Sequence, residues 1–366
     1  MDFNMRTVLD VTVCTHSTGG VGRWVRGLSK GLFAANVEHQ AIDLVETHPG
    51  HISSVPYTKT ISQPGWMRLP LVRRLLLRNG LLESTRASRI EKVTGFPDII
   101  HLSGVQPQGR GRRKVVTFFD DTPWASPESH TEETLVYADN LKGLIDSGAA
   151  VLAISSWAAS VAQDLFGISP ERTGNAGGAA EDIFTPGEAS QDILEKYDLA
   201  AGEFFLHVGS YVPRKNIPFL ISCFKDADTE KKLVLAGAES WGDQMHEDIP
   251  GVIFLKSITD EELLSLYRGA LALLFPSSSE GLGLPVLEAF ACNTPVIASD
   301  GGALRETVDG NGLILPVLER EPWVTAIREM AAEIISDSLR ISAENAPRVT
   351  WKDVAEKTMD FYRSLL

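Results

Sequence analysis

The sequence predicts an α/β protein of two domains. Short apolar and β-branched runs, such as Thr7–Cys14, Phe204–Val208 and Leu271–Phe275, are typical of buried strands. Residues 24–32 follow the first run with apolar side chains at helical spacing. Strands that alternate with helices along the whole chain are typical of sheets covered by helices. The length of 366 residues suits two ordinary domains.

The composition indicates a folded protein of a reducing compartment. Its 43% hydrophobic and 22% charged residues allow sizeable buried cores. No apolar run approaches ~18 residues, so no transmembrane helix is expected. The first six residues lack the order of basic, apolar and small residues of a signal peptide. Cys14, Cys223 and Cys292 are odd in number and far apart, so we expect neither disulfides nor a metal site, and we predict a cytoplasmic protein.

The net charge of −14 is unevenly distributed. Residues 1–115 hold 16 Lys and Arg against 8 Asp and Glu, whereas the remaining residues hold 18 against 40. The basic part suggests an anionic partner, such as a membrane surface or a lipid phosphate, or a face that docks against the acidic half. Residues 66–92 place seven basic side chains among apolar ones. This pattern fits a helix in an anionic membrane interface, and equally a core-facing helix with a solvated basic side.

Residues 271–306 carry the most informative pattern. A predicted strand, Leu271–Phe275, runs into a loop of serines that ends at Glu280. Pro285 is typical of the first turn of a helix, and apolar residues follow it. A helix N-terminus offers N–H groups and a positive dipole to an anion. Glu288, eight residues after Glu280, is expected near the first turn and facing the same ligand.

A glycine-rich loop follows the first predicted strand. Gly19 and Gly20 precede a helical pattern, and glycine lets backbone N–H groups approach a phosphate closely. The loop is not the G-x-G-x-x-G of dinucleotide sites, and no acidic residue ends the second strand as such a site requires. Arg23 either touches an acceptor or donor phosphate or helps to hold the helix.

A second such loop follows Phe204–Val208. Gly209 is followed by Arg214 and Lys215 just before a helical pattern. Arginine can hold two phosphate oxygens, and lysine supplies a compact positive charge, so this loop is a predicted anion site. The Asp226-Ala-Asp228 triplet resembles a metal-binding D-x-D, but it follows a predicted helix on a polar turn, and we predict no metal site there.

These motifs together resemble those of a known family. Glu280 and Glu288 enclose the letters G-L-G-L-P, and E-A-x-A-x-x-x-P-V-I-A-S follows. This stretch resembles the E-x7-E signature of retaining GT-B glycosyltransferases, in the group 1, family 4-like set with bacterial α-mannosyltransferases, other polysaccharide glycosyltransferases and sucrose synthase. The loops with Gly19-Gly20 and with Arg214-Lys215 are similar to the G-G-x-G-R and R-K-N runs of the same family.

The resemblance implies a GT-B fold, in which two Rossmann-like domains face each other across a cleft. Residues 1–190 would form an acceptor-binding domain and residues 191–345 a nucleotide-sugar-binding domain. Residues 346–366 would form a C-terminal helix that crosses back to the first domain.

The resemblance also implies roles for individual residues. Arg214 and Lys215 would stabilise the leaving diphosphate, together with the helix N-terminus near Gly283 and Leu284. Glu280 would bond the hydroxyls of the transferred sugar. Three further residues would contact other parts of the donor: Glu288 the ribose, Lys256 the nucleotide base and Gly209 the diphosphate. Gly19 and Gly20 would face both the donor diphosphate and the acceptor. No metal ion or other cofactor is expected, since the protein cations supply the positive charge.

One position departs from the family pattern. Family members often carry a His-Asp pair at the end of the strand that is predicted here for Val115–Phe119. In this sequence the pair reads Phe119-Asp120. Asp120 or Asp121 would orient the acceptor hydroxyl or act as a base, or either would simply cap the next segment, and Asp120 is the one that matches the family's Asp. No role near the reacting sugar can therefore be given to a histidine.

Substrates and partners follow from the same resemblance. We expect a hexosyltransferase that moves mannose from GDP-mannose to a glycan or lipid-linked acceptor in surface polysaccharide synthesis, with UDP- and dTDP-sugars left open as donors. No nucleic-acid partner is expected. If residues 66–92 bind anionic lipid, the protein is peripheral on the inner face of the membrane. The alternative from another class is an inactive, glycosyltransferase-like partner subunit, which Phe119 favours and the retained Glu280, Glu288, Arg214 and Lys215 disfavour.

Overall fold

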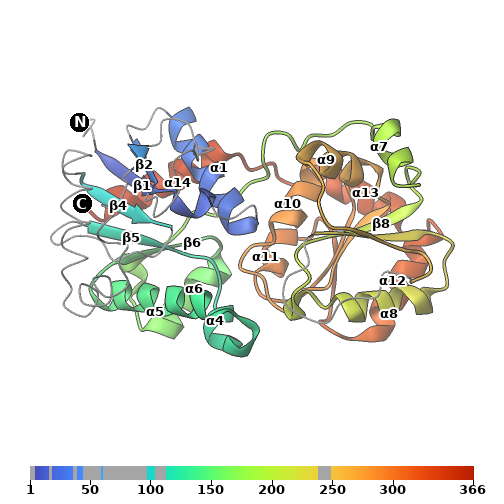
Figure 1. Cartoon of the computed structure of the whole chain (residues 1–366), viewed down its shortest axis with the longest axis horizontal. Coiled ribbons are helices and arrows are strands. Elements are labelled where there is room, and N and C mark those ends of the chain that lie inside the picture. The colour runs from blue at the N-terminus through green and yellow to red at the C-terminus, as the bar shows by residue number, and fades with distance from the viewer. Residues whose placement is uncertain are drawn as a thin grey trace, which may run out of the picture. The chain divides into compact units, whose positions relative to one another are not determined.

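Contacts between residues divide the chain into two units (Figure 1). Unit 1 comprises Met1–Gly178 and Thr350–Leu366, and unit 2 comprises Ala179–Val349. The sequence placed the limits at 190 and 345, whereas the divisions of the structure fall after 178 and 349. The computed structural model describes residues 5–15, 19–35, 39–43, 59–60, 97–103, 113–237 and 249–366.

Unit 1 is built on a parallel sheet with the strand order β3-β2-β1-β4-β5-β6-β7. The order reverses between β1 and β4, where Thr7 lies opposite both His39 of β2 and Ile99 of β4. Ligands of such doubly wound sheets bind beyond the carboxyl ends of the strands, near this reversal. The strands are β1 (Thr7–Asp10), β2 (His39–Asp43), β3 (Lys59–Thr60), β4 (Ile99–Leu102), β5 (Arg113–Phe118), β6 (Ala150–Ala153) and β7 (Thr173–Asn175).

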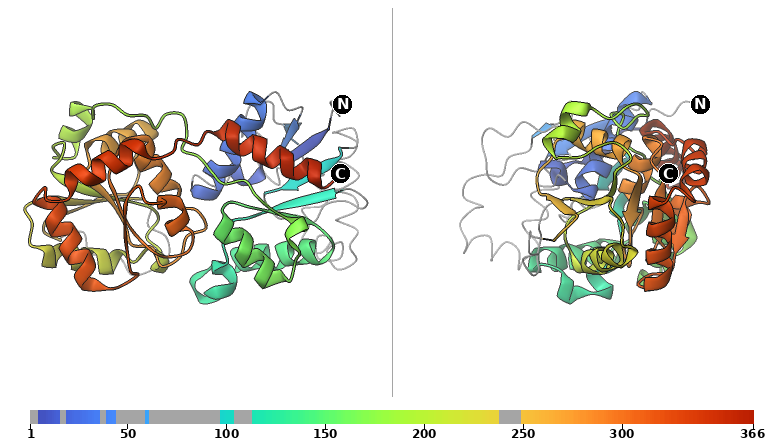
Figure 2. Two further views of the ribbon diagram at one scale, coloured as in Figure 1. Left: turned by 180° about the vertical axis from the view of Figure 1, so that it is seen from behind. Right: turned by 90° about the vertical axis from the view of Figure 1, so that its right-hand side faces the viewer.

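Helices cover both faces of this sheet. Figures 1 and 2 show α1 and α14 together on one face and α5 and α6 on the other. The sequence directs the helix ends locally, since Thr131 caps α5 and Ser155 caps α6 with side-chain oxygens. The helices are α1 (Gly20–Ala34), α4 (Thr122–Ala125), α5 (Glu132–Asp146), α6 (Ser156–Phe166) and α14 (Trp351–Ser364), with 3-10 turns at Thr12–Thr15, Pro127–Ser129 and Pro170–Arg172.

The C-terminal helix α14 is closely packed in unit 1. A capping box of Thr350 and Asp353 begins the helix, and Trp351 then lies against α1. A Cβ atom on Gly31 would lie 1.9 Å from the backbone oxygen of Trp351, so only glycine permits this approach.

A buried hydrogen-bond chain holds the far end of α14. The hydroxyl of Tyr362 lies 2.6 Å from Nδ1 of His101 in β4, and Nε2 of His101 lies 2.8 Å from the hydroxyl of Thr117 in β5. Burial lowers the pKa of His101 to about 3, so its ring is neutral and both of its nitrogens are satisfied. The last helix is thereby joined to two central strands of the sheet.

Unit 2 is built on a second parallel sheet, with the order β10-β9-β8-β11-β12-β13. Its strands are buried on both faces, as their continuous apolar runs predicted. Phe204 and Leu206 of β8 pack into one core, and Phe205 packs into the other. The strands are β8 (Phe204–Val208), β9 (Lys232–Ala236), β10 (Val252–Leu255), β11 (Ala272–Phe275), β12 (Val296–Ser299) and β13 (Leu313–Leu315).

The helices of unit 2 divide between the two cores. Residues of α9, α10 and α11 fill one core, and residues of α8 and α12 fill the other, with Trp323 of α12 completely buried. The helices are α7 (Gln191–Lys196), α8 (Ile217–Ala227), α9 (Asp260–Gly269), α10 (Leu284–Ala291), α11 (Leu304–Val308), α12 (Arg320–Ala331) and α13 (Ser336–Asn345), with a 3-10 turn at Pro213–Lys215.

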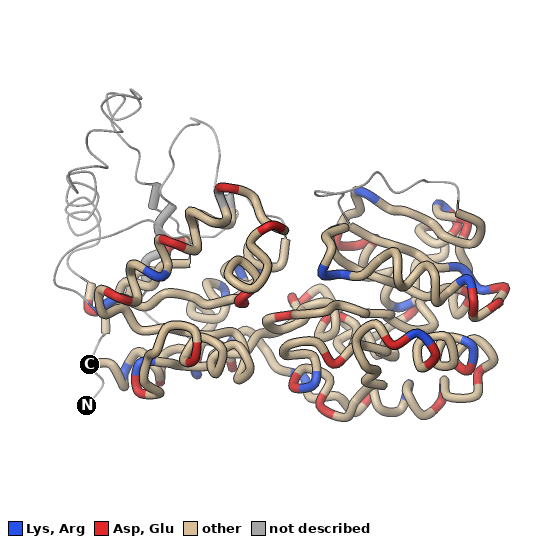
Figure 3. Tube along the Cα trace, turned by 90° about the horizontal axis from the view of Figure 1, so that it is seen from below, with Lys and Arg blue, Asp and Glu red and all other residues tan. Residues whose placement is uncertain are grey.

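The membrane prediction for residues 66–92 falls outside the described residues. Figure 3 marks the charged residues along the described trace, where acidic and basic positions are mixed in both units. Seven of the basic side chains that make residues 1–115 positive belong to 66–92. None of the helices in the described part of the chain combines the length and apolarity that a membrane crossing requires.

The close packing of α14 against Gly31 can be tested with a matched pair of substitutions. Gly31→Ala forces a methyl group into the Trp351 backbone, and we expect it to destabilise the protein by about 2 kcal/mol or more. Gly143→Ala, in the last turn of α5 with open space around its Cβ position, should stabilise the protein by up to about 1 kcal/mol through helix propensity. Urea unfolding followed by circular dichroism measures both, and a wild-type midpoint for Gly31→Ala would contradict the packing.

Candidate active site

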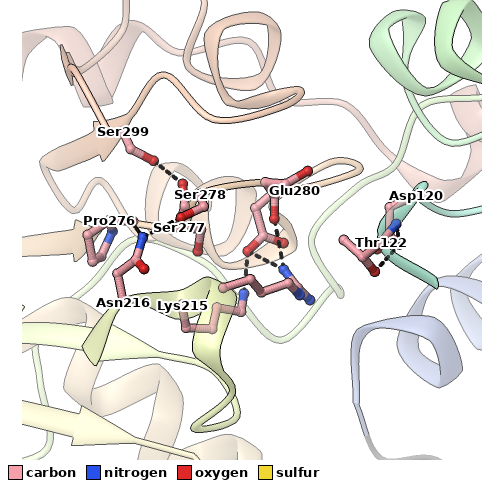
Figure 4. A network of polar contacts seen from close by, with 11 residues as sticks. Asp120, Thr122, Lys215, Asn216, Pro276, Ser277, Ser278, Glu280 and Ser299 are labelled. Carbon is pink, nitrogen blue, oxygen red and sulfur yellow. Dashed lines mark hydrogen bonds and ion pairs between the residues drawn. The ribbon is translucent and has the colours of Figure 1, made fainter. Parts of the chain in front are cut away.

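The site is built from two loops that leave neighbouring parallel strands. β8 pairs with β11, so the loops after their carboxyl ends lie side by side. Asn216, which begins α8 with a left-handed φ of 53°, ties them together. Its side-chain amide donates to the carbonyl of Pro276 at 2.8 Å and to the hydroxyl of Ser278 at 2.7 Å (Figure 4). The N–H of Ser278 donates to the carbonyl of Arg214 at 2.7 Å.

Three charged side chains meet where the loops join (Figure 4). Nη1 of Arg214 lies 2.7 Å from Oε1 of Glu280, and Nζ of Lys215 lies 2.6 Å from the same oxygen. Glu280 is 7% and Lys215 6% exposed, whereas the Arg214 side chain retains 31% exposure. Two cations thus share one carboxylate, and this cluster of Arg214, Lys215 and Glu280, the ion triad, carries one net positive charge.

The ionisation of Glu280 is decided by its two partners. Burial alone raises the pKa of this carboxyl, but the charges of Arg214 and Lys215 and the Lys215 hydrogen bond outweigh burial and lower it to about 2. At neutral pH Glu280 is therefore a carboxylate that only accepts hydrogen bonds, and it cannot serve as a proton donor.

Lys215 is fixed on several sides. Its ammonium lies 4.5 Å above the centre of the Phe275 ring, a favourable cation–π arrangement. Gly209, with a φ of 152°, borders its stem, since a Cβ there would lie 3.3 Å from Cε of Lys215. The loop backbone at Gly209 thus lies against the side chain of Lys215.

The helix that follows Glu280 begins as the sequence predicted. Gly283 precedes α10 with a left-handed φ of 89°, and Leu284 and Pro285 form its first residues. Glu288 lies one turn after Leu284 and is only 3% exposed. Its carboxylate accepts a hydrogen bond of 2.8 Å from the hydroxyl of Tyr267 on α9. Tyr267 was not predicted, because an aromatic residue on an apolar helix face is ordinary in a core.

Lys256 lies on a different feature of unit 2. Together with Lys196, Tyr197 and Ser257 it lines a cavity of about 620 Å³ along β10, and the lining contains no member of the ion triad. The structure brings Arg214, Lys215, Gly209 and Glu280 together, whereas Lys256 follows β10, which lies two strands from β8 in the sheet.

The predicted residues of unit 1 lie at the carboxyl ends of its strands. Gly19 and Gly20 begin α1 and are exposed. Asp120 accepts hydrogen bonds from the N–H and the hydroxyl of Thr122, at 3.1 and 2.6 Å, so it caps the turn that follows β5. This geometry matches the capping role that the sequence left open beside an acceptor role.

Phe119 has a packing role where family members often carry histidine. Its ring lies edge-on to Trp24 of α1, with 5.7 Å between the ring centres. Nε1 of Trp24 donates to the carbonyl of Gly177 at 2.8 Å. Burial and the charge of Asp120 raise the pKa of Asp121, the other carboxyl group for which the sequence left an acceptor role or a base role open.

The D-x-D-like triplet is engaged in a structural contact. Asp226, near the end of α8, pairs with Arg320 of α12. Among the described residues, no group of His, Cys, Asp and Glu side chains has the arrangement of a metal site.

The low pKa of Glu280 links folding stability to pH. Its ordinary pKa is 4.5 and its folded pKa about 2, so its stabilisation is complete above the ordinary value and is lost as the pH falls towards 2. We expect the difference in unfolding free energy between wild type and Glu280→Gln to shrink from about pH 5 to about pH 3. Urea unfolding across this range measures it.

The control for this experiment is Glu203→Gln. The Glu203 side chain is 60% exposed and pairs with Lys231 at the surface. The difference in unfolding free energy between wild type and Glu203→Gln should therefore change little between about pH 5 and about pH 3. A difference between wild type and Glu280→Gln that does not vary with pH would contradict the assignment of the ion triad.

Comparison with known proteins agrees with this geometry. Residues 191–345 match the family of glycosyl transferases group 1. The O-antigen chain mannosyltransferase B of Escherichia coli is 28% identical over 283 residues, which cover 70% of this chain and 71% of that protein. The O-antigen chain mannosyltransferase RfbU of Salmonella typhimurium is 33% identical over 146 residues, 38% of this chain and 41% of the relative.

Solved structures share the fold of the whole chain. Sucrose-phosphate synthase from Thermosynechococcus elongatus has a TM-score of 0.72 at 22% identity, with 99% of both chains covered. HepE of Anabaena, in complex with UDP and glucose, has a TM-score of 0.70 at 16% identity and covers 98% of this chain and all of that one. With two doubly wound parallel sheets, the chain has the GT-B fold, and its residues 191–345 are similar to the glycosyl transferases of group 1.

Proposed function

We propose that this protein is a retaining glycosyltransferase that moves mannose from GDP-mannose to a glycan or lipid-linked acceptor in surface polysaccharide synthesis. The observation that carries the proposal is the ion triad, in which two cations and one carboxylate converge beside a helix N-terminus. The names of the two mannosyltransferase relatives support mannose as the sugar.

Donor binding exchanges the partners inside the triad. A nucleoside diphosphate brings negative charge to Arg214 and Lys215, and the positive end of α10 adds to the attraction. The hydroxyls of the donor sugar then draw Glu280 away from the two cations, a step that a diphosphate without the sugar does not cause. Because Glu280 is ionised, it accepts hydrogen bonds from these hydroxyls and favours positive charge that develops on the sugar ring.

The leaving diphosphate gains negative charge as its bond to the sugar breaks. Arg214 and Lys215 are positioned to stabilise that charge, which is the task a divalent metal performs in other transferases. We therefore propose transfer without a metal ion. The diphosphate oxygen takes the proton of the attacking hydroxyl on the same face of the sugar, which leads to retention.

The remaining donor contacts extend the same scheme. Glu288 would bond the ribose hydroxyls, with Tyr267 orienting its carboxylate from α9. Gly283 and Leu284 would present the start of α10 to the diphosphate. A contact between Lys256 and the nucleotide base stays a prediction. UDP- and dTDP-sugars stay open as alternative donors.

The acceptor would be bound by unit 1, through the exposed Gly19 and Gly20 and the carboxylate of Asp120. A second candidate function is that of an inactive partner subunit. The observation in its favour is Phe119, which is packed on Trp24 where family members often carry histidine. The two candidates differ in whether a donor is bound and transferred.

A panel of nucleotides identifies the donor. We expect GDP and GDP-mannose to raise the melting temperature more than UDP, dTDP, ADP and their sugars, and EDTA to leave the shift unchanged. Arg214→Ala and Lys215→Ala should each reduce the shift strongly without removing all affinity, since one cation of the pair remains. Arg340→Ala, which removes a mostly exposed arginine paired with Asp337 on α13, should keep it. If no nucleotide shifts the melting temperature, the partner-subunit function is favoured instead.

The stereochemistry of the product tests retention directly. With GDP-α-mannose as the donor, we expect an α-linked product, read from the one-bond carbon–proton coupling of the new anomeric centre by NMR. A β-linked product would overturn the same-face reaction while leaving the donor assignment intact.

A further inference from the structure

His207 is a buried residue of unit 2 that the scheme above does not use. It lies in β8 with no exposed surface, and its ring stacks on Phe275 at 5.7 Å between ring centres and 21° between planes. Nδ1 lies 2.9 Å from the carbonyl oxygen of Leu274. A carbonyl only accepts, so Nδ1 carries the proton and Nε2 is left as an acceptor.

Nε2 of His207 has no hydrogen-bond partner in the part of the chain that the structure describes. A buried polar atom in this state is uncommon in a folded protein and calls for a physical reason. Burial lowers the pKa of His207 to about 4, with the charge of Lys215 acting in the same direction, so the ring is neutral near neutral pH.

Nε2 borders the same space as the Lys215 side chain. A Cβ atom on Gly209 would lie 3.6 Å from Nε2 of His207, 3.5 Å from Nζ of Lys215 and 3.3 Å from Cε of Lys215. The acceptor and the ammonium therefore face one small space beside Gly209. Phe275 lies under both, since the imidazole stacks on its ring and the ammonium lies above it.

The proposed exchange of partners takes the Glu280 carboxylate away from Lys215 and makes a neighbouring acceptor favourable. In the structure its ammonium is held by Glu280 at 2.6 Å. When a donor sugar draws Glu280 away, Lys215 stays buried and cannot turn fully to water, because the residue is only 6% exposed. A buried ammonium with an unmet hydrogen is costly.

We infer that His207 is a positioning residue whose Nε2 accepts a hydrogen bond from Lys215 when the donor sugar takes Glu280. The stacked ring and the bond to Leu274 fix the acceptor in place beforehand. His207 thus keeps Lys215 directed at the diphosphate after the ion triad has opened. The inference rests on the proposed function, because it requires Glu280 to be the sugar contact.

Two substitutions separate the roles of the ring nitrogens. His207→Asn keeps an N–H near the position of Nδ1 and removes the acceptor at Nε2, whereas His207→Gln places an amide oxygen near Nε2. We expect His207→Asn to weaken GDP-mannose binding by about tenfold, the size of one hydrogen bond to a charged group, and His207→Gln to restore most of it. GDP without a sugar leaves Glu280 on Lys215, so its affinity should change little.

Isothermal titration with GDP-mannose and GDP, and with UDP-glucose and UDP, provides these affinities. His207→Asn in a Lys215→Met background should have no further effect, because both variants remove the same hydrogen bond. Melting temperatures establish that each variant is folded, and His130→Asn, a partly exposed histidine of unit 1, serves as the matched control.

The outcomes separate this inference from the proposed function. Equal weakening of GDP and GDP-mannose by His207→Asn, or an undiminished effect without Lys215, would overturn the positioning role while donor binding by wild type stands. If wild type binds neither nucleotide sugar, the proposed function fails, and the role of His207 fails with it.

Discussion

The sharing of one carboxylate by two cations is the interaction on which the candidate site depends. Arg214 and Lys215 come from the loop after β8, and Glu280 comes from the loop after β11. Neither lysine nor glutamate tolerates burial alone, so each makes the other's position possible. The triad therefore joins the two loops. It also holds in place the two cations that a phosphorylated ligand would contact.

The supports around the triad explain why it is so well defined. The side-chain amide of Asn216 donates to the carbonyl of Pro276 and to the hydroxyl of Ser278, which both follow β11. The ring of Phe275 lies beneath the ammonium of Lys215. These contacts fix the backbone, and the charged groups are the parts that would change partners in the proposed function. A site organised in this way is rigid in its frame and adjustable in its ion pairs, which suits a ligand that is both bound and released.

The sequence predicted this half of the protein well because its signals are local. The apolar runs of β8 and β11, the glycine-started helix α10 and the spacing from Glu280 to Glu288 all depend on neighbours in the chain. What it missed arises from packing that the chain order does not show. Tyr267 reaches Glu288 from α9, and the loop after β8 turns back so that Lys215 lies beside His207 at Gly209. Residues 66–92, whose basic pattern left two interpretations open, lie outside the described residues.

The path of the chain has a consequence for synthesis on the ribosome. Unit 2 is continuous, whereas unit 1 is completed by α14, which packs on α1 and bonds to His101 through Tyr362. Unit 2 can therefore fold as soon as it leaves the ribosome exit tunnel. Unit 1, although its strands are made first, exposes the groove for α14 until the helix has emerged. The earlier part of the chain is thus the later to finish folding, and it is the part for which chaperones have the longest time to act.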